Sequence, residues 1–117
     1  MKSNKNSGRC YELNFKYCTC NEGWLLVHGN CINPKNGIKQ GHAWCEKEVQ
    51  LNVNNTEVKL LMVYDAVSET EIPKDAYYYF GKCEAIEKYT AQQAIDMVLK
   101  YKHFGYWEHE DQMGITK

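Results

Sequence analysis

Alternation of apolar and polar residues constrains the fold of this chain more than any other feature of its sequence. In one segment every second position is apolar, in the order Val58, Leu60, Met62 and Tyr64. This is the period of a β-strand that buries one face. A shorter alternation covers residues 42–46, and the asparagine-rich stretch 52–55 is typical of a turn. Residues 41–65 therefore predict an antiparallel strand pair, and Leu61 and Val63 favour a central position for its second strand.

A helix is predicted on the N-terminal side of this strand pair. Residues 10–17 space their apolar side chains at helical intervals behind Gly8, which puts Cys10 in the first turn. Residues 23–29 are apolar and β-favouring, and residues 33–37 carry the asparagine, proline and glycine of a turn. We therefore expect a helix followed by a strand and its exit.

The C-terminal half carries signals for two more helices. Residues 72–81 have a proline near the start and a glycine at the end, as a short helix does. Residues 82–89 predict a strand, and Thr90 with Gln93 forms a capping box that opens the last helix. That helix should end near Lys102 and bury a stripe made of Ala94, Ile95, Val98 and Leu99.

The whole chain of 117 residues has the length of one domain. Its order of elements predicts the α+β class, with an antiparallel sheet and the N-terminal helix packed on it. The aromatic segment 103–107 is expected to fold back over the core. Residues 1–8 and 108–117 are polar and are expected to be flexible.

Charge and hydropathy exclude several classes of partner. The formal net charge is −1, so no field favours nucleic acid or acidic lipid. The polar N-terminus lacks the apolar run of a signal peptide, and no stretch reaches the roughly 20 apolar residues that span a bilayer. We expect a cytoplasmic protein that acts on a protein or peptide, and its oligomeric state is not predicted.

Six cysteines raise the questions of disulfides and of metal binding. Without a secretion signal we expect free thiols, although a disulfide framework is the alternative in a secreted chain. Cys18, Cys20 and Cys31 offer three thiolates, but their spacing departs from the two paired ligands of structural zinc sites. We therefore predict no metal and no cofactor, and most of these cysteines are interpreted as small buried hydrophobes.

Three residues have the chemistry of a thiol hydrolase, which needs a thiolate, a base and a group that orients the base. Cys10 at a helix N-terminus would have its thiolate stabilised by the helix dipole and by free amides. His42 opens the strand after Gly41, and Asp65 closes the neighbouring strand. Because a strand's start lies opposite its antiparallel partner's end, His42 and Asp65 are expected to be neighbours.

This order of residues resembles the transglutaminase-like branch of papain-like enzymes. The resemblance spans residues 8–67 and is carried by helix-borne Cys10, by GHAWCE at 41–46 and by VYDA at 63–66. It implies a minimal transglutaminase-like core in which the cysteine begins a helix, the histidine begins the next core strand, and an aspartate orients it. The chain also resembles small bacterial and phage proteins that pair such strands and finish in a tyrosine-rich helical tail, here residues 73–107.

The predicted function is a cysteine hydrolase or acyltransferase, of peptidase or deamidase type, with Cys10, His42 and Asp65 as its catalytic residues. Each has a structural alternative: Cys10 as a thiol packed under its helix, His42 as a satisfied core histidine, and Asp65 as the cap of the turn that follows it. His28 is the rival base. Two rival functions stay open, a catalytically inactive protein-binding domain such as a phage-encoded inhibitor, and a zinc-stabilised interaction module.

Overall fold

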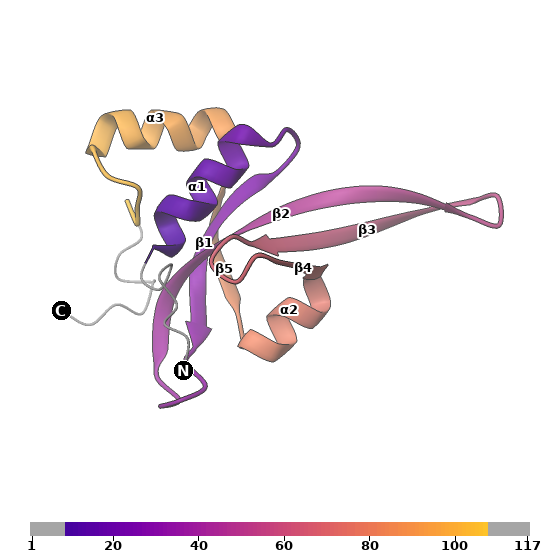
Figure 1. The fold of residues 1–117 in the computed structure, drawn as a ribbon, viewed down its shortest axis with the longest axis horizontal. Helices are drawn as coiled ribbons and strands as arrows, with labels where there is room; N and C mark the ends of the chain where they lie inside the picture. Colours follow the sequence, from indigo (N-terminus) through magenta and orange to yellow (C-terminus); the bar gives the residue numbers. More distant parts are fainter. Residues whose placement is uncertain (1–8, 108–117) are drawn as a thin grey trace.

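A computed structural model describes residues 9–107 as an α+β fold with a five-stranded antiparallel sheet and three helices (Figure 1). The elements follow in the order α1 (Cys10–Cys20), β1 (Leu25–Ile32), β2 (Lys39–Val53), β3 (Thr56–Asp65), β4 (Thr70–Pro73), α2 (Lys74–Gly81), β5 (Glu84–Tyr89) and α3 (Ala91–Tyr101). The predicted class and the packing of the N-terminal helix on the sheet are thus confirmed. The expected flexible ends lie outside the described residues.

The sheet has the strand order β4-β3-β2-β1-β5, and every neighbouring pair is antiparallel. The predicted strand pair is the β2–β3 hairpin, which is longer than expected and projects from the body as a two-stranded arm (Figure 1). Its turn contains Asn54 and Asn55 at φ 50° and 63°, a left-handed conformation that asparagine tolerates well. The asparagine-rich stretch therefore closes the hairpin as predicted.

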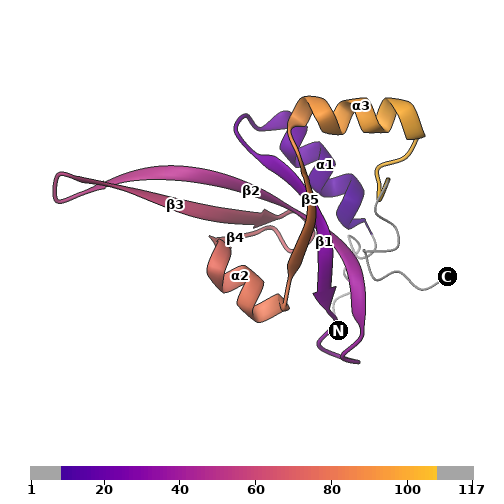
Figure 2. The ribbon, with the colours of Figure 1, turned by 180° about the vertical axis from the view of Figure 1, so that it is seen from behind.

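The two faces of the sheet are covered by different helices. Helices α1 and α3 pack on one face, and α2 lies against the other (Figure 2). The larger core, under α1 and α3, consists of Cys18, Trp24, Leu26, Cys45, Tyr89, Ala94 and Trp107. The smaller core, under α2, is built on Val27, Trp44 and Val63.

Close packing in the smaller core explains one glycine of β1. A Cβ at Gly29 would lie 2.1 Å from the carbonyl oxygen of Glu84 and 2.8 Å from the ring of Trp44. Because the first of these atoms belongs to the backbone of β5, the neighbour cannot move aside, and a side chain here would push β1 and β5 apart.

Helix α3 forms as the capping box predicts, with one error in its buried stripe. The hydroxyl of Thr90 accepts from the Gln93 N–H at 3.1 Å, and the Gln93 side chain accepts from the Thr90 N–H at 2.9 Å. Leu99, however, is 62% exposed, so its predicted burial is wrong. Met97 packs against the core instead, and α3 lies against α1 as well as against β1 and β5.

The aromatic segment after α3 folds back over the core as predicted. The ring of Trp107 packs against His28 and Tyr89, and Phe104 packs against Phe15. These contacts bury most of Trp107.

Strand β3 is central over only part of its length, which corrects the prediction from Leu61 and Val63. Strand β4, which the sequence does not signal, pairs with β3 at Met62 to Asp65 alone. Val63 is fully buried there, but Leu61 lies outside this region and is 43% exposed. Among the described residues, no helix has the length and apolar content needed to cross a membrane.

Candidate active site

Three side chains from three elements meet where the pairing of β2 with β3 ends. The Nε2 atom of His42 lies 3.0 Å from Oδ2 of Asp65 and 3.0 Å from the hydroxyl of Tyr77, on α2. The Tyr77 hydroxyl in turn donates to Oδ2 of Asp65 at 2.6 Å. The predicted meeting of His42 and Asp65 therefore occurs, with Tyr77 as a third member that the sequence did not reveal.

The route by which His42 and Asp65 meet differs from the expected one. Strand β2 begins at Lys39, after a turn at residues 33–38, so His42 is its fourth residue. The ladder between the two strands ends at Cys45 and Tyr64. Asp65 therefore extends just beyond the ladder, and its side chain reaches His42 along the free edge of β2.

The hydrogen bonds around Asp65 fix the tautomer of His42. Burial favours the protonated form of Tyr77 and raises its pKa, so this hydroxyl has one proton and donates it to the carboxylate. Both oxygens near Nε2 are then able to accept, which makes Nε2 the N–H of a neutral imidazole. Nδ1 is left as the nitrogen that can take a proton.

The carboxylate of Asp65 serves two functions at once. Its Oδ2 atom faces His42, and its Oδ1 atom accepts from the backbone N–H of Val67 at 2.9 Å. Burial acts to raise the pKa of Asp65, but the hydrogen bonds from His42, Tyr77 and Val67 outweigh it and hold the pKa below its usual value. Turn capping and histidine orientation, considered as alternatives in the sequence, are both present.

Cys10 is half-buried at the first position of α1 and lies beside His42. Burial acts to lower the pKa of His42, but hydrogen bonds with Asp65 and with the Cys10 side chain outweigh it and raise the pKa above its usual value. Both groups thus favour an imidazolium, in which Nδ1 carries the second proton. The predicted pairing of the Cys10 thiol with His42 stays a prediction.

A second residue that the sequence analysis missed, Asn14, joins the three elements of this site. Its amide Nδ2 donates to the Cys10 carbonyl at 2.9 Å and to the Ala43 carbonyl at 3.1 Å. Its Oδ1 atom accepts from the Ala66 N–H at 3.0 Å. These backbone groups belong to Cys10 itself and to the residues that follow His42 and Asp65. The fully buried Asn14 therefore fixes the positions of all three predicted catalytic residues.

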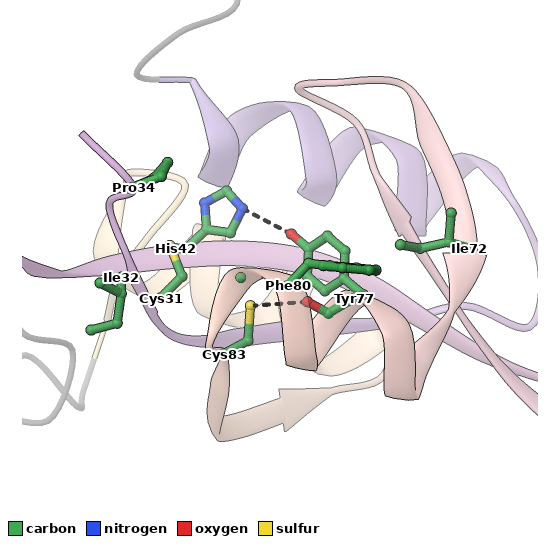
Figure 3. Close-up of a pocket in the computed structure, with 9 residues that line it drawn as sticks. Cys31, Ile32, Pro34, His42, Ile72, Tyr77, Phe80 and Cys83 are labelled. Carbon is green, nitrogen blue, oxygen red and sulfur yellow. Dashed lines mark hydrogen bonds between the residues drawn. The ribbon is translucent and has the colours of Figure 1, made fainter. Parts of the chain in front are cut away.

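A pocket of about 310 Å³ opens beside His42 on the α2 face of the sheet (Figure 3). His42 and Tyr77 form its inner wall, and the thiols of Cys31 and Cys83 border it. The remaining side chains that line it are apolar, namely Ile32, Pro34, Ile72 and Phe80. The site therefore has a polar end at the histidine and an apolar extension away from it.

The other predicted candidates lie elsewhere. His28, the rival base, is buried among the rings of Tyr11, Tyr89 and Trp107. Within residues 9–107, no group of three or more histidine, cysteine or acidic side chains is arranged to hold a metal ion.

The cysteines of the zinc alternative are separated. The Cys18 thiol is buried and donates to the carbonyl of Trp24, Cys20 is exposed at the end of α1, and Cys31 borders the pocket. None of the six cysteines forms a disulfide in the structure.

Comparisons with known proteins add no assignment to this geometry. No family model, no curated protein and no solved structure matches the chain. The transglutaminase-like core thus stays a prediction, and the function has to be argued from the side chains themselves.

Proposed function

We propose that the protein is a cysteine hydrolase or acyltransferase in which His42 activates Cys10 and Asp65 orients His42. One observation carries the proposal: Nε2 of His42 is held by Asp65 at 3.0 Å, and Asn14 ties the backbone of Cys10 to that of Ala43, the residue after His42. A nucleophile, a base and an orienting carboxylate are the three parts that thiol catalysis requires.

The chemical step follows from the tautomer of His42. At neutral pH Nδ1 of His42 holds the proton that the Cys10 thiol has given up, because the pKa of His42 is raised. The Cys10 sulfur attacks the carbonyl carbon of an amide. The tetrahedral intermediate collapses, the C–N bond breaks, and the amine leaves with the proton from Nδ1. A thioester on Cys10 is left, and water hydrolyses it or a second amine takes the acyl group. Asp65 stabilises the imidazolium that exists between the two proton transfers.

The first turn of α1 supports the remaining requirement, a site for the oxyanion. Its N-cap residue, Arg9, makes no side-chain capping bond, and the first backbone N–H groups of a helix have no partner within the helix. Cys10 is the first residue of that turn. Amides beside the nucleophile are suitable donors to a developing oxyanion.

The proposal extends to the family and the setting. A helix-borne cysteine, a strand-borne histidine and an aspartate at the end of the adjacent strand are the parts shared by transglutaminase-like enzymes, and we assign this chain to that branch. A protein or peptide amide is the substrate class. We also propose a cytoplasmic location, where thiols are kept reduced.

Iodoacetamide labelling tests the proposal with a control inside the same helix. Cys20 is an exposed thiol at the far end of α1, away from the histidine. At pH 7 we expect Cys10 to be alkylated at least about tenfold faster than Cys20, as measured by peptide mapping, because a paired thiolate reacts faster than a thiol. The His42→Ala variant should lose this advantage.

Two outcomes would contradict the proposal. Equal labelling of Cys10 and Cys20 in the wild-type protein would mean that His42 does not activate the thiol. Unchanged Cys10 reactivity in His42→Ala would mean that another group does. In either case the protein-binding function, without catalysis, becomes the better explanation.

A further inference from the structure

The pocket beside His42 has a chemistry that indicates what the site binds. Among the residues that line it there is no carboxylate, lysine or arginine, and its ionisable members are His42, Tyr77 and two thiols. A charged group placed there would lose its hydration, and the charge of His42 is already paired with Asp65. The pocket therefore selects a neutral group.

The size of the pocket narrows the choice further. Small-molecule sites have volumes of roughly 300 to 1,000 Å³, and this one, at about 310 Å³, is at the lower limit. That space suits one large aliphatic or aromatic group, rather than an extended polymer. Ile32 and Pro34 border it at one end and Ile72 at the other (Figure 3).

The position of the pocket connects it to the proposed nucleophile. His42 belongs both to its wall and to the catalytic arrangement, and Cys31 in the wall is close enough to Cys10 and His42 for their charges to act on it. A group held in the pocket would therefore lie next to His42, the residue that the pocket shares with the catalytic arrangement. The acyl group of a substrate stays bound to Cys10 after the amine has left, so it is the part that a permanent pocket at this site can hold throughout the reaction.

We propose that this pocket binds a neutral apolar side chain or acyl chain on the carbonyl side of the scissile bond. The proposal rests on the proposed function of the same site. The shared chemistry is an apolar acyl group, supplied either by a leucine-like residue of a peptide or by a medium-length fatty acyl chain. Phe80 and Ile72 then determine specificity without touching the reacting atoms.

Thiol protection in a Cys10→Ala variant tests binding without any need for catalysis. Cys31 and Cys83 border the pocket, whereas Cys20 is exposed elsewhere. We expect hexanamide, or N-acetyl-leucinamide for the peptide source, to slow alkylation of Cys31 and Cys83 but not of Cys20. Acetamide should protect none of them. The amide that protects at the lower concentration identifies the source of the acyl group.

A neighbouring pair of residues on α2 supplies matched variants. Tyr79 and Phe80 are 76% and 78% exposed, and only Phe80 lines the pocket. In Phe80→Ala the concentration of hexanamide needed for protection should rise at least about fourfold, the effect of losing contact with one methylene or more. Tyr79→Ala should leave it unchanged.

Acylation of Cys10 in the wild-type protein separates the two proposals. The thiolate attacks p-nitrophenyl hexanoate or acetate, the ester C–O bond breaks, and p-nitrophenolate leaves with the electron pair. We expect hexanoate to react at least about tenfold faster, because several methylenes enter the pocket.

Each result decides one of the two proposals. Equal rates with both esters, together with no protection by any apolar amide, overturn the pocket assignment while the reactive Cys10 stands. Protection of Cys31 and Cys83 without acylation of Cys10 supports the pocket and overturns the hydrolase.

Discussion

Two buried carboxylates lie on the same face of the sheet, and neighbouring tyrosines of α2 bind them. Tyr77 donates to Asp65, and Tyr78 donates to Oε2 of Glu46 through a short contact. The carboxylates nevertheless have different surroundings. Glu46 accepts from Trp44 Nε1 at 2.9 Å and from Lys88 Nζ at 2.9 Å, whereas Asp65 holds His42.

The difference lies in what the partners can do with a proton. Burial acts to raise the pKa of Glu46, but hydrogen bonds from Tyr78, Trp44 and Lys88 outweigh it and hold the pKa below its usual value. None of these donors releases a proton near neutral pH. The partner of Asp65 is an imidazole, which can take up and release a proton during a reaction. Similar carboxylates thus stabilise the fold in one place and, in the proposed mechanism, orient a base in the other.

Removing Glu46 should have the largest effect on stability. Glu46→Ala leaves the fully buried Trp44 N–H without an acceptor. It also removes the negative charge that pairs with Lys74 and Lys88. We expect a loss of about 3 kcal/mol in the free energy of unfolding, measured with urea. The exposed neighbour Glu48 supplies the control, since Glu48→Ala should cost less than about 0.5 kcal/mol. A loss below about 1 kcal/mol in Glu46→Ala would show that the network is not structural.

Variants of Tyr77 and Tyr78 should distinguish effects on the stability of the protein from effects on the reactivity of Cys10. Tyr77→Phe and Tyr78→Phe each remove one hydrogen bond to a carboxylate and should each cost about 2 kcal/mol of unfolding free energy. Only Tyr77→Phe should also slow alkylation of Cys10, because only Tyr77 contacts His42. Tyr79→Phe, on the exposed side of the same helix, is the control. Equal loss of Cys10 reactivity in both variants would remove the distinction between the carboxylates.

Replacing each carboxylate by its amide tests the catalytic assignment directly. Asp65→Asn should slow alkylation of Cys10 at pH 7 at least about tenfold, a change of about 1.4 kcal/mol, because an amide no longer stabilises the imidazolium. Glu46→Gln should leave that rate nearly unchanged in the folded protein. A slower rate in Glu46→Gln alone would assign the orienting role to the wrong residue.

The contributions of Glu46 and His42 to the free energy of unfolding should depend on pH in opposite directions. Each contribution amounts to about 1.4 kcal/mol for each unit by which folding shifts the pKa of the group. The pKa of Glu46 is lowered, so its contribution is present above the usual value near 4.5 and is lost as the pH falls. The pKa of His42 is raised, so its contribution is complete below about 6.5 and is lost as the pH rises through the folded-state value.

Difference measurements isolate these two contributions from those of other groups. The stability difference between the wild-type protein and His42→Gln should shrink from pH 6 to pH 9. The difference between the wild-type protein and Glu46→Gln should stay constant over that range. Urea unfolding at several pH values measures both, and a constant His42 difference would mean that the imidazole is not charged in the fold.

Local patterns in the sequence predicted the elements better than the contacts between them. Alternation defined β2 and β3, and the capping box of Thr90 and Gln93 defined the start of α3. Strand β4 was missed because four residues are too few to show a period. The burial of Leu99 was wrong because the contacts of α3 with α1, β1 and β5 decide which of its apolar residues are covered, and no local pattern contains these contacts.

The candidate site was predicted in part for the same reason. Residue chemistry and chain order indicated His42 and Asp65, but three consecutive tyrosines gave no sign that Tyr77 alone would reach them. Asn14, four residues after Cys10, was one clue that was available, because a polar residue on the buried side of a helix needs partners. The burial of Glu46 had no signal in the sequence, because the two lysines that pair with it are far away along the chain.

The β2–β3 arm implies that the backbone hydrogen bonds of β2 open at different rates at its two ends. Near the body, β2 is held on both sides, by β1 up to Glu46 and by β3 from Cys45. From Leu61 toward the turn at Asn54 and Asn55, the hairpin has no third strand and few buried residues. Local fraying is therefore enough to expose the backbone amides of this part to solvent. Amide hydrogen exchange should therefore be fast at Asn52 and slow at Cys45. Strand β2 thus holds the candidate base, His42, at one end, while its other end can open without moving His42.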